Sequence, residues 1–582
     1  MEKIFKFMKN DEIGKVTYVD SGQIIVEVTE NNSLGKISIG NLVVIGTTKM
    51  YEYTIGIISK VTRKYSDIIQ SDGENEVEEF DTLIGTSSDY IKVDVIGTFK
   101  EVYGEESNVF KRGIDIFPHL DASCYSLSGI NLQKFMNILN SNSGIKTKLK
   151  LGKFMMDVNA EAILDGNKFF QRHAAILGST GSGKSWCVAN ILEKAFELKH
   201  PNIIVFDMHG EYASLCNEGR IASRYKIAGT GDLENPGENI LFLPYWLLNR
   251  DEMLSMLLDR SDNNAPNQAS RLIHYIRELK EETLDLEGKK KVKETFTVDS
   301  PIQYDIKKLI QYLKKDDKEM IPGSNLGKEK QGALHGRLTR LISRLEAKIS
   351  DKTHGFMFLP PKDSYKYDWL SEQMYKLIGN SSSDMGIKVI DFSEVPSDIL
   401  PIVTGTVARL LYNIQFWMKT EDQTPFTLIC DEAHLYLPTK DEADISQKQA
   451  LYNFERIAKE GRKYGISLLV VSQRPADVSK TILSQCNNFI VLRLTNERDK
   501  SVIKNLIPDS LRGTLDSISL LDVGESLVIG DSVLLPSRII LDKPKIKPLS
   551  ATRDFWNEWE RKEPNNSAIL EAIESMRKQS RN

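Results

Sequence analysis

The stretch Gly178–Ser185 reads GSTGSGKS and matches the pattern G-x-x-x-x-G-K-[ST] in full. An apolar run, HAAILG, precedes it, and a helical pattern, KSWCVANILEKAFELK, follows. Glycines adopt backbone angles that other residues avoid, so phosphate oxygens can approach the N–H groups of such a loop. The N-terminus of the following helix adds further N–H donors and partial positive charge. The stretch therefore predicts a phosphate-binding loop between a strand and a helix.

Two side chains of this loop carry groups that a bound triphosphate requires. We expect Lys184 to reach the β- and γ-phosphates, and the Ser185 hydroxyl to be a ligand of Mg²⁺. ATP and Mg²⁺ are therefore the predicted cofactors. The residues predicted to bind them are Gly178, Thr180, Gly181, Ser182, Gly183, Lys184, Ser185 and Trp186.

Two carboxylates end a later apolar run, in the stretch FTLICDEAH. Asp431 is the predicted Mg²⁺ partner, acting through water, and Glu432 is the predicted general base that polarises the attacking water. The alternative is an ordinary helix start, where Asp and Glu are common. Gln473 ends the next run, in VVSQRP, and is predicted to sense the γ-phosphate or to orient water. The alternative for Gln473 is a turn residue at a strand end.

Asp207 ends another strand-like run, in NIIVFDMHGEY, and His209 and Glu211 follow it. One interpretation places these residues on the nucleotide or DNA side of the sheet. A turn or capping role is the alternative, and the sequence does not decide between them.

Two arginines lie where local folding does not require a charge. Arg462, in KEGRKYG, ends a helical pattern before a strand, and Arg172, in FFQRHAAILG, precedes the first strand of the core. In the transition state of hydrolysis, the γ-phosphate needs added positive charge, which an arginine of a neighbouring chain often supplies. The alternative for Arg462 is that it stabilises the C-terminus of its helix through the helix dipole, and a role other than supplying this charge also stays open for Arg172.

The elements around these residues predict an α/β fold. Near-continuous apolar runs alternate with helical patterns after about residue 165, which is typical of a doubly wound parallel sheet. Because the phosphate loop lies in this region, we assign the sheet to a P-loop core that resembles the RecA-like (ASCE) class. Residues 1–150 instead contain short runs rich in Val, Ile, Thr and Tyr, separated by turn-forming residues, and predict a small β-barrel. The stretch RGIDIFPHLDASCY is interpreted as the linker that leaves this barrel.

The predicted domain boundaries follow from these patterns. Residues 151–245 and 381–545 are assigned to the ATPase core, because they contain the strand-and-helix alternation. Residues 246–380 have helical periodicity and many charges, and are assigned to a helical insertion. Residues 546–582 are assigned to C-terminal helices.

Composition excludes several functional classes. The net charge of −5 excludes a uniformly basic nucleic-acid-binding surface, so any nucleic acid must be bound locally. The five cysteines are far apart and include no C-x-x-C pair, which argues against a zinc site or a disulfide framework. We find no signal peptide and no apolar run long enough to span a membrane, and predict a cytoplasmic protein.

Five stretches, in this order, resemble the HerA-like ATPases of the HerA/FtsK superfamily: LGSTGSGKS, FDMHGEY, LICDEAH, EGRKYG and VVSQRP. The N-terminal segment resembles the HerA barrel domain. The resemblance implies a homo-hexameric ring that hydrolyses ATP at its subunit interfaces and moves DNA through a central pore. It implies that Lys184 and Glu432 act in one subunit, and that Arg462, with Arg172, acts on the neighbouring one.

The resemblance also implies a partner at the face of the barrel. Such a partner is a NurA-type nuclease in DNA end processing, or a Sir2-like NADase or other nuclease in bacterial antiviral defence. A different function stays open, in which the ring is an ATP-dependent scaffold that activates a bound effector without translocation. A type IV secretion or conjugation ATPase is a weaker alternative, because such proteins often carry membrane helices.

Overall fold

A computed structural model describes most of the chain. The described residues are 4–7, 11–29, 37–66, 86–101, 109–113, 116–142, 147–155, 157–217, 220–322, 328–379, 386–507, 515–550, 553–561, 563 and 565–580. They form two compact units, which are described separately below. The first unit comprises Met1–Lys194, Gln473–Ala476 and Cys486–Pro544, and the second comprises Ala195–Ser472, Asp477–Gln485 and Lys545–Asn582.

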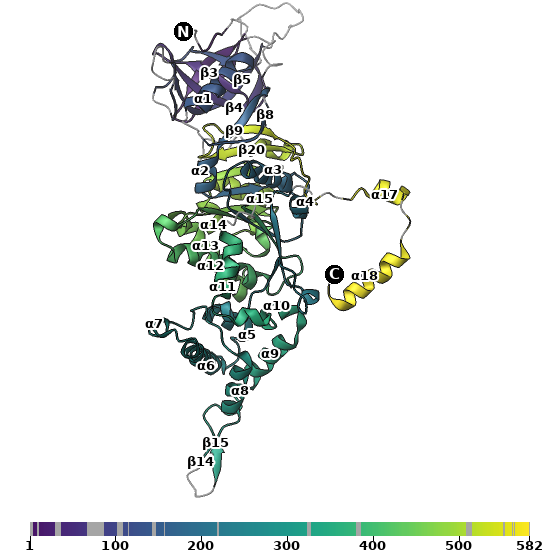
Figure 1. The fold of residues 1–582 in the computed structure, drawn as a ribbon. Coiled ribbons are helices and arrows are strands. Elements are labelled where there is room, and N and C mark those ends of the chain that lie inside the picture. The colour runs from purple at the N-terminus through teal and green to yellow at the C-terminus, as the bar shows by residue number, and fades with distance from the viewer. Residues whose placement is uncertain are drawn as a thin grey trace, which may run out of the picture. The chain divides into compact units, whose positions relative to one another are not determined.

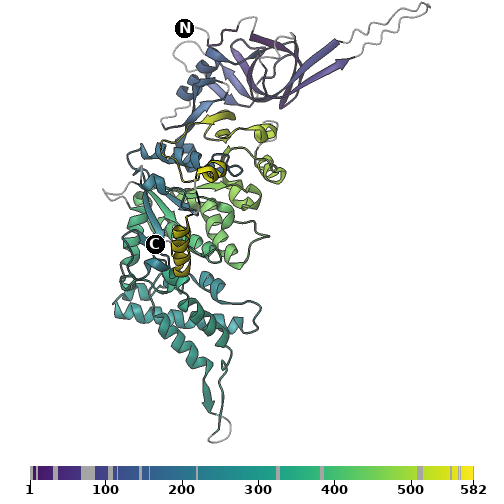
Figure 2. The same ribbon diagram turned by 90° about the vertical axis from the view of Figure 1, so that its right-hand side faces the viewer.

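An antiparallel β-barrel forms the N-terminal part of the first unit (Figure 1). Six strands follow one another in the order β2-β1-β7-β3-β4-β5, and pairing of β2 with β5 closes the barrel, while β6 pairs with β5 outside this circuit. Valine and isoleucine side chains from these strands fill its interior. The long strands β4 and β5 extend together beyond the barrel (Figure 2). The strands are β1 (Glu12–Val19), β2 (Gln23–Val28), β3 (Leu42–Gly46), β4 (Glu52–Ser66), β5 (Thr86–Lys100), β6 (Val109–Arg112) and β7 (Ser123–Ser126).

The interpretation of RGIDIFPHLDASCY as a linker that leaves the barrel was wrong for its last residues. Strand β7 lies in the stretch interpreted as a linker, yet it pairs with both β1 and β3 and completes the barrel. It has only four residues, SCYS, so it lacks the alternating apolar pattern from which strands are recognised. Helix α1 (Gly129–Asn142) follows the barrel.

The rest of the first unit is a mixed sheet that carries the phosphate loop. Its strand order is β10-β19-β20-β21-β8-β9, in which β10 and β19 are parallel and the other pairs are antiparallel. The strands are β8 (Lys148–Phe154), β9 (Asp157–Asp165), β10 (Ala174–Leu177), β19 (Asn488–Val491), β20 (Glu525–Gly530) and β21 (Ser537–Leu541). The helices are α2 (Gly166–Gln171), α3 (Lys184–Phe196), which continues into the second unit, and α15 (Glu497–Leu506).

The second unit is built on a parallel sheet with the order β13-β12-β16-β11-β17-β18. Strands β11, β16, β17 and β18 are buried along their whole length, as expected for a parallel sheet covered on both faces. The strands are β11 (Ile203–Asp207), β12 (Ser223–Ile227), β13 (Ile240–Leu241), β16 (Ile387–Asp391), β17 (Phe426–Cys430) and β18 (Ile466–Ser472). The core helices are α4 (Ala213–Asn217), α12 (Leu400–Trp417), α13 (Ile445–Glu460) and α14 (Lys480–Gln485).

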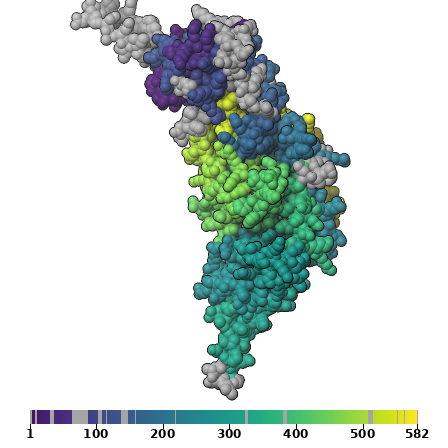
Figure 3. All heavy atoms as spheres, turned by 60° about the vertical axis from the view of Figure 1, so that its left-hand side comes forward, coloured from purple at the N-terminus to yellow at the C-terminus, as the bar shows by residue number. Residues whose placement is uncertain are grey.

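A helical insertion separates β13 from β16. Figure 3 shows its atoms in teal as a tapering body next to the green atoms of the core in the same unit. Two short strands at its end form an antiparallel pair. Its elements are α5 (Arg250–Leu257), α6 (Ala265–Leu286), α7 (Lys290–Lys293), α8 (Ile306–Asp317), β14 (Met320–Pro322), β15 (Glu329–Gln331), α9 (Thr339–Ser350), α10 (Gly355–Phe358) and α11 (Trp369–Ile378).

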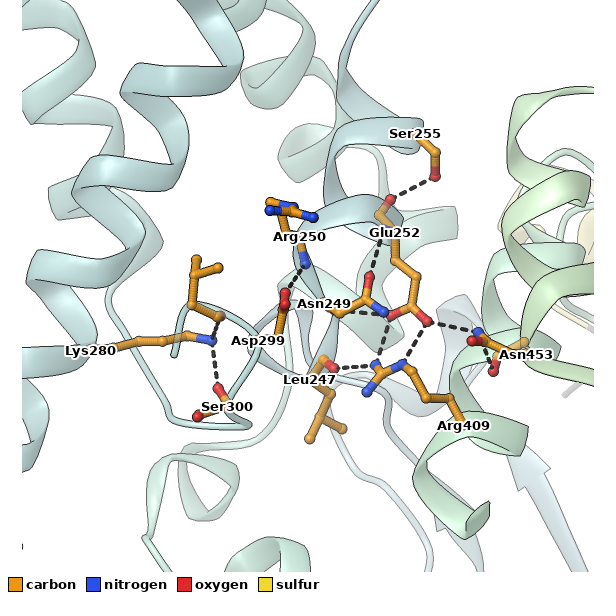
Figure 4. Close-up of polar contacts among 12 residues, drawn as sticks. Leu247, Asn249, Arg250, Glu252, Ser255, Lys280, Asp299, Ser300, Arg409 and Asn453 are labelled. Carbon is orange, nitrogen blue, oxygen red and sulfur yellow. Dashed lines mark hydrogen bonds and ion pairs between the residues drawn. The ribbon is translucent and has the colours of Figure 1, made fainter. Parts of the chain in front are cut away.

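A buried ion pair joins the insertion to the core (Figure 4). Arg409 of α12 donates to both carboxylate oxygens of Glu252 in α5, at 2.8 and 2.7 Å, and to the carbonyl oxygen of Leu247 at 2.8 Å. Asn453 of α13 donates to the same carboxylate at 3.2 Å, and Glu252 also accepts the N–H of Asn249 at the start of its own helix. Core helices α12 and α13 are therefore both bonded to the first helix of the insertion.

The structure confirms the predicted fold class, because a parallel-sheet α/β core follows a closed N-terminal barrel. The domain boundaries stay predictions, and residues 380 and 381, where the insertion is predicted to end, lie outside the described residues. The C-terminal helices are α17 (Phe555–Arg561) and α18 (Asn566–Lys578), and neither buries a side chain. Within the described residues, no helix is long and apolar enough to cross a bilayer.

Candidate nucleotide site

The phosphate loop connects the buried strand β10 to helix α3. Gly181 and Gly183 have φ angles of +74° and +108°, which are left-handed values that favour glycine. A Cβ atom on Gly178 would lie 2.6 Å from Ser182 Oγ and 2.8 Å from the Cβ of Leu492. The loop can therefore take this path only with glycine at position 178 and, without strain, at positions 181 and 183.

The interior of the loop presents unused hydrogen-bonding groups. Among the described residues, the main-chain N–H groups of Gly181 and Gly183 have no hydrogen-bond partner, and the buried Ser182 Oγ has none either. Lys184 is buried and its ammonium group donates to the carbonyl oxygen of Ser179 at 3.3 Å, so its head turns back over the loop. N–H donors without acceptors in a single loop fit an anionic phosphate. Ser185 and Trp186 begin helix α3 and are half-buried.

Gln473 reaches this loop. The Thr180 hydroxyl donates to the side-chain oxygen of Gln473, and Gln473 directly follows strand β18 in the chain. The structure thus brings together two of the residues predicted for the site that lie far apart in sequence. Which function Gln473 has there stays a prediction.

Asp431 and Glu432 follow the carboxyl end of β17, in the second unit. Asp431 is 4% exposed, and Glu432 has φ +44° and ψ +47°, a left-handed conformation that is rare for a residue with a side chain. The backbone reverses at Glu432 and does not start a regular α-helix there, because a single 3₁₀ turn, Ala433–Leu435, follows. This geometry weakens the alternative of an ordinary helix start.

The acidic residues at this edge perturb one another. Burial raises the pKa of Asp431 well above its usual range, and the charges of Glu432, Asp207 and Glu211 raise it further. A divalent cation would remove this penalty, since a positive charge favours the ionised carboxylate. The donor chemistry at Asp431 therefore fits Mg²⁺, which prefers carboxylate oxygen and water.

His434 contacts Glu432 and was not predicted as a site residue. Its Nδ1 lies 3.3 Å from Glu432 Oε2 and 3.4 Å from the Ser472 hydroxyl at the end of β18. The imidazole is largely buried, so it fixes where the Glu432 carboxylate points. The available signal was its position in DEAH, close to the carboxylate on the same turn.

Asp207 caps the turn that follows β11. Its Oδ1 accepts the N–H groups of His209, Gly210 and Glu211 at 3.3, 2.8 and 3.1 Å, and its Oδ2 accepts that of Tyr212 at 3.0 Å. Burial raises the pKa of Asp207 to about 6 despite these four bonds. Of the two interpretations left open by the sequence, the capping role is the one these bonds display.

The two predicted arginine fingers lie at the amino ends of their strands. Arg172 precedes β10, whereas the phosphate loop follows the carboxyl end of that strand. Arg462, in the turn Gly461–Tyr464, precedes the seven-residue strand β18, which runs parallel to β17. A strand rises about 3.3 Å per residue, so roughly 20 Å separates Arg462 from the carboxyl edge where Asp431 lies. Arg462 is exposed, and its guanidinium has no partner among the described residues.

Comparison with known proteins finds similarity to HerA helicases. Residues 149–411 match the family model of the helicase HerA central domain. The chain is 27% identical over 399 residues to the probable helicase MJ1565 of Methanocaldococcus jannaschii, covering 68% of this chain and 67% of that protein. It is 25% identical over 533 residues to the DNA double-strand break repair helicase HerA of Sulfurisphaera tokodaii, covering 89% and 96%.

The HerA central-domain match includes the phosphate loop and Asp207, and it ends before Asp431. Both helicases named above match beyond that domain, since the aligned lengths exceed it. Among solved structures, VirB4 of Thermoanaerobacter pseudethanolicus covers 68% of this chain, with 18% identity and a TM-score of 0.43.

Proposed function

We propose that this chain is an ATP-driven DNA translocase or helicase of the HerA type. It would work as a homo-hexameric ring with DNA in a central pore and a partner nuclease or NADase at the barrel, in DNA end processing or antiviral defence. The observation that carries the ATPase assignment is the loop between β10 and α3, with its unpartnered N–H groups, inside residues that match the HerA central domain. The match to helicases supports DNA as the substrate of the motor.

The residue assignments follow from the chemistry of each group. Lys184 holds the β- and γ-phosphates, and Ser185 and Asp431 hold Mg²⁺, which neutralises charge on the phosphates when bound. Glu432 accepts the proton of the attacking water, and Gln473 orients that water or senses the γ-phosphate. His434 keeps the Glu432 carboxylate in place.

Arg462 and Arg172 serve the neighbouring subunit. Their support is their position at amino ends of strands, away from the carboxyl ends that carry the nucleotide-binding groups. A guanidinium that cannot reach its own phosphate is available to a phosphate on an adjacent copy, and such a finger accelerates hydrolysis by about 10³-fold or more.

The Glu432→Gln protein tests this function. It should bind Mg–ATP with wild-type affinity but hydrolyse it at least about 10²-fold more slowly, because the general base is lost. ATP turnover of the wild-type protein should rise with duplex DNA, and translocation should stop in the variant. Turnover can be followed as phosphate release, and translocation as displacement of a blocking protein from DNA.

The matched control is Glu421→Gln, which removes an exposed carboxylate from the same unit and should leave turnover unchanged. A wild-type protein with no affinity for Mg–ATP would contradict the proposal. Turnover that does not respond to DNA, together with effector activation that survives in Glu432→Gln, would instead favour the ATP-dependent scaffold.

A further inference from the structure

Asp531 lies in the turn between β20 and β21 and contacts two arginines from separate parts of the first unit. Its Oδ2 accepts a hydrogen bond from Arg172 Nη1, and its Oδ1 lies 3.7 Å from Arg112 Nη1. Asn487 Nδ2 adds a third contact to Oδ2 at 3.3 Å. Arg172 precedes β10, and Arg112 ends the barrel strand β6. One carboxylate thus connects the barrel to a predicted finger.

The backbone around Asp531 is fixed against the loop that carries Asn487. The N–H of Asp531 donates to the carbonyl oxygen of Asn487, and the N–H of Asn487 donates to that of Arg172. Gly530 has φ +134°, and a Cβ there would lie 2.2 Å from the Asn487 oxygen. Only glycine therefore permits this close approach, which sets Asp531 beside Arg172.

Arg112 fastens the barrel to the same turn. Its guanidinium donates to the carbonyl oxygens of Gly530 at 2.7 Å, of Leu534 at 3.2 Å and of Val533. Three main-chain acceptors hold a planar guanidinium in a defined orientation, which lysine could not reproduce. A movement of β6 therefore moves the turn that holds Asp531.

We propose that Asp531 is a positioning residue that keeps Arg172 in an ion pair, away from the neighbouring subunit's phosphate. Arg112 makes the strength of this ion pair depend on the position of the barrel. The inference rests on the proposed role of Arg172 in hydrolysis by a neighbouring subunit. To reach that phosphate, Arg172 has to leave Asp531. Arg112 and Arg172 share the Asp531 carboxylate. When the barrel keeps Arg112 close to Asp531, the ion pair between Asp531 and Arg172 is weaker. When the barrel moves Arg112 away, that ion pair is stronger.

The full-length Asp531→Asn protein is the first test. It should raise kcat for ATP by about two- to fivefold, the effect expected of a partly exposed ion pair, and leave KM unchanged. In an Arg172→Ala background the same substitution should have no effect on kcat, because no finger is left to release. Arg112→Gln should change kcat in the opposite direction, since Asp531 would then have Arg172 as its only arginine.

The control is Glu161→Gln, which removes a partly exposed ion pair with Lys150 in the same unit and should leave kcat unchanged. An Asp531→Asn effect equal to that control, or one that persists in the Arg172→Ala background, would overturn the inference. So would wild-type turnover in the single Arg172→Ala protein. A wild-type chain without ATP hydrolysis would contradict the proposed function itself, before any of these variants is compared.

Discussion

The ammonium group of Lys280 lies in the interior of the helical insertion (Figure 4). Lys280 is 1% exposed, and its Nζ donates to the carbonyl oxygens of Val298 and Ser300 at 2.7 Å each. Burial lowers its pKa to about 7, the charge of Asp299 raises it by less, and that of Arg409 lowers it. The amino group of Lys280 thus holds helix α6 to the segment that returns along it, and among the described residues it is bonded to main-chain carbonyls and not to a carboxylate.

We expect this residue to make stability depend on pH. The unfolded lysine has a pKa near 10.4, so between about pH 7 and pH 10 the unfolded chain binds a proton that the folded chain has released. The free energy of unfolding therefore rises with pH in this window, by at most about 1.4 kcal/mol per pH unit from one proton. Below pH 7 both states are protonated, and the full penalty of burial remains.

Lys280→Met should remove this contribution, and urea unfolding measured from pH 7 to pH 9.5 would show it as a flatter dependence. The exposed Lys307→Met is the matched control and should keep the wild-type slope. Parallel pH profiles for wild type and Lys280→Met would show that the lysine does not titrate in this range.

At the scale of elements, helices α5, α12 and α13 meet at the Arg409–Glu252 pair. The two side chains are 11% and 1% exposed, so both charges depend on each other for solvation. Helix α13 also leads directly into the turn that carries Arg462. Through its bond to Asn453, Glu252 therefore also anchors the insertion on the helix that leads to a predicted finger.

Arg409→Ala should destabilise the second unit by about 3 kcal/mol or more, because Glu252 is left buried without its cation. Thermal unfolding or urea titration would measure this loss. The double substitution Glu252→Gln with Arg409→Met should recover part of it, since neither group then carries a buried charge. Lys366→Ala, which breaks an exposed pair with Asp363, should leave the free energy of unfolding nearly unchanged. Equal losses of unfolding free energy in Arg409→Ala and Lys366→Ala would contradict a special role for the buried pair.

At the scale of the whole molecule, the function proposed above requires that two copies of the chain contribute to each site. Arg462 lies at the amino edge of the second unit's sheet, and Asp431 lies at the carboxyl edge. One copy would therefore supply the base, and the next copy would supply the guanidinium. A homo-oligomer built by a repeated head-to-tail contact satisfies this requirement at every interface.

Mixing two inactive proteins tests this requirement. Lys184→Ala should lose ATP binding, and Arg462→Ala should keep binding but hydrolyse slowly. In a random mixture of equal parts, on the order of a quarter of the interfaces combine an intact Lys184 with a neighbour's intact Arg462, and turnover should recover to that extent. Recovery can be measured as phosphate release after subunit exchange. Two variants that stay inactive when they demonstrably co-assemble would place Arg462 outside the site.

Much of the fold could be predicted from the sequence because the features concerned are encoded by neighbouring residues. The phosphate loop is one continuous stretch, and its glycines and lysine need no distant partner to be recognised. The parallel strands could be predicted as well, because strands buried on both faces form unbroken apolar runs. Strand β7 escaped detection because four residues with mixed polarity carry no periodic signal.

Local patterns in the sequence predicted a phosphate-binding loop, and they predicted correctly the α/β class of the core and the barrel that precedes it. Which distant charges meet is known only from the folded chain: Arg172 meets Asp531 across 359 positions, and Arg409 meets Glu252 across 157. The physical reason is range, because a loop motif or a periodic pattern is encoded within a few neighbouring residues. An ion pair between remote segments depends on strand order and register, which no local pattern specifies.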